Sequence, residues 1–208
     1  MTTALDFLNP INAAIDAGKK LVDVIVSLKD RRDRETTSII ADLTDLMEEL
    51  RKTHSTIVKL VSPLRRMDDN PATFGEDFKK LYFDFRDFYD AYDFGDERTH
   101  CHKIGQIQNR MLKRRPLFGS TQLWDELYQS LNALSNADMD IIEARYKPFM
   151  AWFNECMNKI YQNVNANTIP QAITEKQNFL AMLGPEYDKN KQMLDEMTDT
   201  IGVLTARL

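Results

Sequence analysis

The chain of 208 residues has few of the side chains on which most catalytic and metal sites depend. It contains three histidines and only two cysteines, Cys101 and Cys156. Without a secretory context, two cysteines predict reduced thiols rather than a disulfide. The short motifs that bind nucleotides or zinc, or that present a catalytic serine, are also missing: G-x-G-x-x-G, G-x-x-x-x-G-K-[ST], H-E-x-x-H, C-x-x-C and G-x-S-x-G. We therefore expect no enzyme activity, no cofactor and no small-molecule substrate.

Glycine and proline are scarce, with seven of each. So few turn-forming residues favour long helices over a turn-rich β architecture. No stretch of 18 uncharged apolar residues occurs, so we expect no helix that crosses a bilayer. The first residues, MTTALDFLNP, lack the cationic region of a signal peptide. These features predict a cytoplasmic protein.

Basic residues are outnumbered, 27 to 32, which gives a net charge of −5. Wrapping a nucleic acid requires a concentrated cationic face, so we expect no nucleic-acid partner. The length and the 43% of hydrophobic residues are sufficient for a sizeable core.

Aromatic residues are concentrated in one stretch, residues 74–94, which holds nine of the twenty. At about 100° per residue, eight large apolar side chains of this stretch fall in an arc of about 120°. They are Phe74, Phe78, Leu81, Tyr82, Phe85, Phe88, Tyr89 and Tyr92. The pattern predicts a helix that faces the core, and the spacing of Thr73 and Glu76 predicts a capping box at its start. Phe83 and Phe94 fall on the opposite side of this helix. We predict that they cover a second neighbour or form a contact surface.

Helical periodicity continues along the rest of the chain. We expect helices over residues 4–28, 38–66, 97–115, 121–134, 138–164, 171–183 and 186–207, with Gly184 and Pro185 dividing the last two and Pro148 kinking or dividing the helix before them. No linker rich in glycine or serine and no internal repeat divides the chain. The sequence predicts an all-α fold, a single up-and-down bundle of six to eight helices, most of them long, in one domain over residues 1–208.

The first helix, residues 4–28, has an apolar stripe wider than a peripheral helix needs. We interpret it as a central helix of the bundle. The alternative is a segment that leaves the bundle and enters a membrane interface or a groove in a partner. Its polar face mixes acids with lysines, which favours the central position.

Glu97 and His100 form an E-x-x-H pair, the spacing that di-iron carboxylate bundles use to place two ligands in the core. Those bundles need two such motifs and two more glutamates, and this chain has one motif. Together with His54, the pair would make at most a mononuclear site. We favour structural roles for all three residues and predict no metal site.

The densest basic cluster lies at the end of the helix over residues 97–115. It consists of Arg110, Lys113, Arg114 and Arg115. If it meets the arginines at positions 31, 32 and 34, it would form a cationic cap for a phosphate, an acidic partner or an anionic lipid surface. The alternative is a set of solvated charges that favour a helix C-terminus.

These features lead to three functional hypotheses. The first is a non-enzymatic helical bundle that acts through protein–protein contacts and self-associates into a homo-oligomer through Phe83 and Phe94. The second is a membrane-acting helical effector, of the defence or cell-death type, whose first amphipathic helix inserts into lipid. The third is a mononuclear metal-binding protein.

Overall fold

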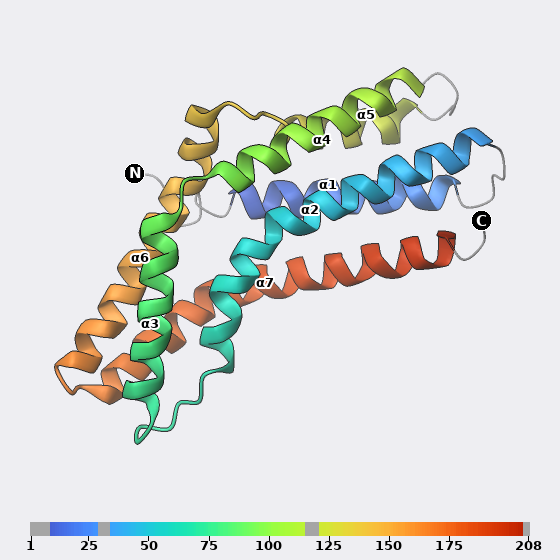
Figure 1. The fold of residues 1–208 in the computed structure, drawn as a ribbon. Helices are drawn as coiled ribbons and strands as arrows, with labels where there is room; N and C mark the ends of the chain where they lie inside the picture. Colours follow the sequence, from blue (N-terminus) through green and yellow to red (C-terminus); the bar gives the residue numbers. More distant parts are fainter. Residues whose placement is uncertain (1–8, 29–33, 115–120, 206–208) are drawn as a thin grey trace.

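The computed structural model describes residues 9–28, 34–114 and 121–205. These residues form seven α-helices and no strands: α1 (Asn9–Leu28), α2 (Arg34–Arg66), α3 (Phe74–Ala91), α4 (Gly95–Arg114), α5 (Thr121–Asn132), α6 (Met139–Asn165) and α7 (Ile169–Thr205). The prediction of an all-α helical bundle is confirmed. Figure 1 shows that the bundle is elongated, because α2 and α7 run along most of its length.

Two hydrophobic clusters follow each other along this length. We call the first the α1 core; it joins α1, α4 and α5 to the first half of α2 and the last part of α7. The second, the α3 core, joins α3 and α6 to the last part of α2 and the first half of α7. The two longest helices, of 33 and 37 residues, therefore contribute to both clusters.

Helix α1 is enclosed in the α1 core, where α2, α5 and α7 pack around it. Ala17, Leu21 and Val24 have no exposed surface. Gly18 lets α7 approach closely, because a Cβ atom at this position would lie 3.1 Å from side-chain atoms of both Met193 and Met197. The interpretation of the first helix as a central element is therefore confirmed for residues 9–28.

The aromatic stripe of α3 faces the α3 core as predicted. Phe74, Phe78, Tyr82 and Phe85 are buried. The ring centroid of Phe85 lies 5.1 Å from that of Phe153 on α6, within the range of favourable aromatic pairs. Helix α3 is thus an outer helix whose inner face packs mainly on α6.

Two predicted helix starts differ from the structure. Thr73 is the N-cap residue of α3, but its side chain makes no capping hydrogen bond, so the predicted capping box is wrong. The backbone carbonyl of Asn70 instead accepts the N–H groups of Thr73 and Phe74, at 3.1 and 2.9 Å. Helix α2 begins at Arg34, four residues before the start at residue 38 that the sequence predicts.

The predicted break at Gly184 and Pro185 is also wrong, because α7 continues through both residues. A proline removes one backbone hydrogen bond and crowds the preceding turn. Here, packing holds the helix on either side, with Leu183 buried in the α3 core and Met193 in the α1 core. Helix α6 likewise continues through Pro148.

Helix α6 starts as predicted. Asp138 is its N-cap residue, and the carboxylate accepts a hydrogen bond from the N–H of Asp140 at 3.0 Å.

A buried lysine connects α7 to the turn between α2 and α3. Lys176 is 3% exposed, and its Nζ lies 2.7 Å from the carbonyl oxygen of Met67 and 2.5 Å from Oδ1 of Asp69. The same ammonium lies 5.6 Å from the ring centroid of Phe74. Its hydrogen bond lowers the pKa of Asp69, against the opposing effect of burial. Lys176 therefore holds the α2–α3 turn against α7, because its ammonium donates hydrogen bonds to the Met67 carbonyl and the Asp69 carboxylate.

We expect Lys176→Met to lower the free energy of unfolding by about 2 kcal/mol, because the Met67 carbonyl and the Asp69 carboxylate lose their charged donor. Urea denaturation of both proteins measures the loss. Lys191→Met, at an exposed position on the same helix, is the control and should change stability by less than about 0.5 kcal/mol. Equal losses in the two variants would contradict the role given to Lys176.

Candidate functional site

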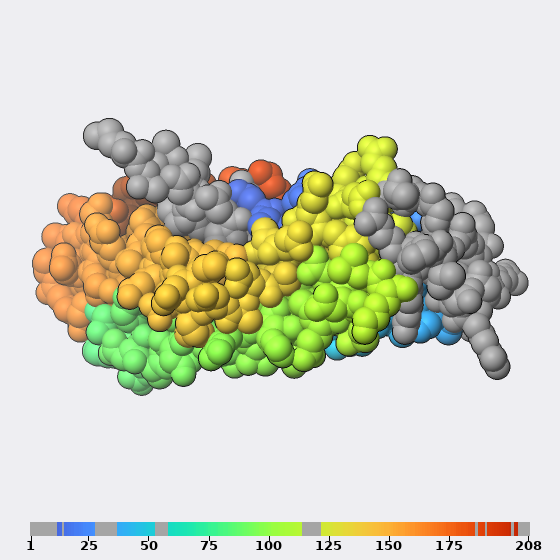
Figure 2. All heavy atoms as spheres, turned by 90° about the horizontal axis from the view of Figure 1, so that it is seen from above, coloured from blue at the N-terminus to red at the C-terminus, as the bar shows by residue number. Residues whose placement is uncertain are grey.

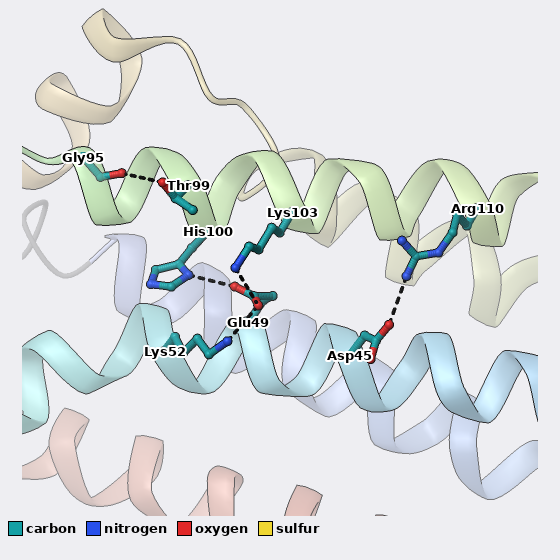
Figure 3. A network of polar contacts seen from close by, with 8 residues as sticks. All are labelled: Asp45, Glu49, Lys52, Gly95, Thr99, His100, Lys103 and Arg110. Atoms are coloured by element: carbon teal, nitrogen blue, oxygen red, sulfur yellow. Dashed lines mark hydrogen bonds and ion pairs between the residues drawn. The ribbon is translucent and has the colours of Figure 1, made fainter.

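A polar network centred on Glu49 joins α2 to α4 (Figure 3). The Glu49 side chain is 9% exposed, and its Oε2 lies 2.8 Å from Nδ1 of His100. Its Oε1 lies 3.0 Å from Nζ of Lys52 and 3.6 Å from Nζ of Lys103. One carboxylate therefore receives hydrogen bonds or charge from three side chains on two helices.

The surroundings of Glu49 keep it ionised. Burial raises the pKa of this carboxyl, but the hydrogen bonds from His100 and Lys52 and the charge of Lys103 outweigh burial, so the pKa lies below its ordinary value. A carboxylate that orients an imidazole is also the arrangement of a general base. In this network, however, the carboxylate and the imidazole are used to pair α2 with α4.

Glu97 and His100 do not act together. Glu97 is 2% exposed and faces Tyr92, whose pKa is raised by burial and by its hydrogen bond with the Glu97 carboxylate. His100, one turn later, pairs with Glu49. In the part of the chain that the structure describes, no three side chains of His, Cys, Asp or Glu gather in a way that could hold a metal ion. The side chain of His54, the third weak candidate, lies outside the described residues.

The basic cluster at the end of α4 is partly used inside the fold. Nε of Arg110 lies 2.8 Å from Oδ1 of Asp42, and its Nη2 lies 3.1 Å from Oδ2 of Asp45, both on α2. Arg110 therefore fastens α4 to the start of α2 rather than facing a ligand. Lys113 is exposed, whereas the side chain of Arg114 and all of Arg115 lie outside the described residues.

The two predicted interface residues have different surroundings. Phe83 on α3 is 54% exposed. Its ring stands edge-on to Tyr82 and to Tyr161 of α6, which stack with each other at 3.9 Å between ring centroids. Phe94 is half-buried in the α3–α4 connection, where its ring lies edge-on to Tyr92. Phe83 therefore faces solvent, whereas Phe94 packs on the interior.

Phe94 also has an unusual backbone conformation, with φ at 60°. Large side chains rarely adopt this left-handed region. The Asp93 carboxylate accepts the N–H of Gly95 at 2.9 Å, so Asp93 supports the first turn of α4. The chain thus changes direction at Phe94 between the two helices.

A groove that periodicity could not reveal opens between α2 and α3, with α6 as its floor. Its cavity measures about 250 Å³ and is lined by Lys59, Leu60, Pro63, Leu81, Asp84, Phe85, Phe88, Phe153 and Met157. Phe88, which the sequence assigns to the buried stripe, is 36% exposed at this position. The exposure of Phe88 depends on how far α2 and α3 diverge, and the pattern of apolar residues does not predict this divergence.

We found no family model that matches this chain, and no curated protein or solved structure that is similar to it. We therefore infer a function from the surfaces and internal contacts of the structure alone.

We expect Glu49→Gln to lower the free energy of unfolding by about 1 to 2 kcal/mol at pH 7, because the charged acceptor of the network is lost. Since folding lowers the pKa of Glu49 from its ordinary 4.5, its stabilisation is present above that pH and is lost as the pH falls through the folded value. The difference in free energy of unfolding between wild type and variant should therefore become smaller from about pH 5 downward. Denaturation curves at several pH values measure this difference.

The control is Glu48→Gln, which changes an exposed residue next to Glu49 and should show neither the loss of stability nor its pH dependence. A difference between wild type and Glu49→Gln that stays constant with pH would contradict this role of Glu49.

Proposed function

We propose that this protein is a non-enzymatic helical bundle that acts through protein–protein contacts and self-associates through the outer surface of α3. The observation that carries the proposal is the exposure of Phe83 on a helix that lies along the outside of the molecule, in front of α6 (Figure 1). Burying a phenylalanine side chain contributes about 1.5 to 3 kcal/mol, so a partner that covers it gains affinity.

Phe83 is not an isolated apolar side chain. Its ring contacts that of Tyr161 on α6, which is itself only partly buried, so the apolar surface around Phe83 continues onto the neighbouring helix. An exposed apolar area that extends over several residues is typical of an interaction surface, whereas single exposed residues are ordinary. The outer surface of α3 is therefore a better candidate for the interface than Phe94 is.

The use of the polar groups supports a role without catalysis. His100 and Glu49 pair with each other, and Arg110 pairs with Asp42 and Asp45. Each of these side chains contributes to the contact between α2 and α4, and that contact accounts for its position without a catalytic role.

The enclosure of α1 argues against the alternative in which the first helix inserts into lipid. Releasing it would expose Leu21, Val24 and Ile25, all within 1% of complete burial, along with their partners on neighbouring helices. At about 1.5 to 3 kcal/mol for each large side chain, the cost is a large fraction of an ordinary folding stability of about 5 to 15 kcal/mol. In the described residues, no helix has the length and apolar character needed to span a membrane.

We expect the protein to sediment as a dimer or larger species at micromolar concentration. Phe83→Ser should raise the dissociation constant of the dimer about tenfold or more, because the interface loses the apolar area of the exposed ring. Val203→Ser is the matched control, since Val203 on α7 is also 54% exposed. A wild-type protein that remains monomeric to about 100 µM, or equal effects of the two substitutions, would contradict the proposal.

A further inference from the structure

A regular stripe of exposed residues runs along the outer side of α3, centred on Phe83. Its members are Glu76, Lys80, Phe83, Asp87 and Asp90, and all five are exposed. Their spacings of four, three, four and three residues keep them within a narrow arc, at about 100° per residue, on the side opposite the buried stripe. Phe83 is both the midpoint of the stripe and its only apolar member.

Charge is distributed unevenly about this midpoint. Lys79 and Lys80 precede Phe83, whereas Asp87 and Asp90 follow it. A two-fold axis that crosses α3 between Phe83 and Asp84 reverses the direction of the helix. It brings residue 80 of one copy opposite residue 87 of the other and leaves the two Phe83 residues about 1.5 Å apart along the helix. On either side of its midpoint, at positions 80 and 87, the stripe is therefore complementary in charge to its own antiparallel copy.

On the basis of the self-association proposed above, we infer that two copies of this chain pair antiparallel along α3. The two Phe83 rings meet at the axis, and Lys80 of each copy faces Asp87 of the other. Such an isologous contact uses the same patch twice and closes at a dimer. A parallel arrangement would place like charges together, which disfavours it.

The remaining acidic side chains of α3 do not prevent this pairing. Asp84 lines the groove between α2 and α3, about 100° around the helix from Phe83, so it lies beside the seam. Asp90 pairs with Arg86, with distances of 3.1 and 3.2 Å from Nη2 to its two carboxylate oxygens. This pair reduces repulsion where Asp90 approaches Glu76 of the other copy.

The size of the contact sets the strength that we expect. Helix α3 has 18 residues and is about 27 Å long, so a dimer that uses this helix and the neighbouring edge of α6 falls at or below the lower end of specific interfaces, about 1,200 Å² in total. We expect a dissociation constant on the order of a few micromolar.

Reversal of the paired charges tests the arrangement, with sedimentation velocity of the full chain as the measurement. Lys80→Asp alone, and Asp87→Lys alone, each turn both pairs into repulsive ones and should weaken the dimer about tenfold or more. The double variant restores opposite charges and should dimerise as wild type does. A mixture of the two single variants should form a heterodimer for the same reason. Asp199→Lys, an exposed position on α7, is the control for a change in net charge.

The outcomes separate this inference from the proposal on which it depends. If wild type and all variants dimerise equally, self-association stands and the α3 pairing is wrong. If the single variants are monomeric but neither the double variant nor the mixture recovers, the pairing of positions 80 and 87 is also wrong. If wild type is monomeric throughout the range, both the self-association and the pairing fail. Helix content measured by circular dichroism verifies that each variant is folded.

Discussion

The structure depends on the two long helices, α2 and α7, which are shared by both hydrophobic clusters. Neither cluster is closed without them, because the α1 core uses Leu43 and Met197, and the α3 core uses Leu64 and Phe179, from the same pair of helices. Burial of apolar side chains at both ends therefore stabilises each long helix along its whole length. The fold is thus built from two cores in series, and Figure 2 shows α3 and α6 toward one end of the molecule and α4 and α5 toward the other.

The shorter connections adapt to this arrangement. After α3, the chain must leave the α3 core and enter the α1 core with α4, and it turns at Phe94 with a positive φ. A non-glycine residue in this conformation costs on the order of 1 to 3 kcal/mol. The ring of Phe94 offsets this cost, since it packs against the α3 core and against the small cluster of Cys101, Ile142 and Tyr146. The strain is therefore held in place by packing on both sides.

The sequence predicts the helices well because they follow a local property, the period of apolar residues. It predicts poorly where distant residues decide the outcome. Pro185 looks like a boundary to any local argument, and the helix continues there because Leu183 and Met193 are anchored in different cores.

Polar contacts across the chain are equally invisible to a local pattern. Glu49 and His100 are 51 residues apart, so the E-x-x-H spacing directed attention to Glu97 instead. The groove beside Phe88 depends on the angle between α2 and α3, which no spacing encodes.

The placement of Phe83, in contrast, follows from the sequence, and the reason for it bears on function. Charged side chains such as Glu49, Arg110 and Lys176 form ion pairs with residues elsewhere in the fold and so hold its elements together. Phe83 adds little to that internal stability, because 54% of its surface remains in water. An apolar ring that contributes little to the fold, on an outer helix with lysines on one side and aspartates on the other, gains stability mainly when another surface covers it.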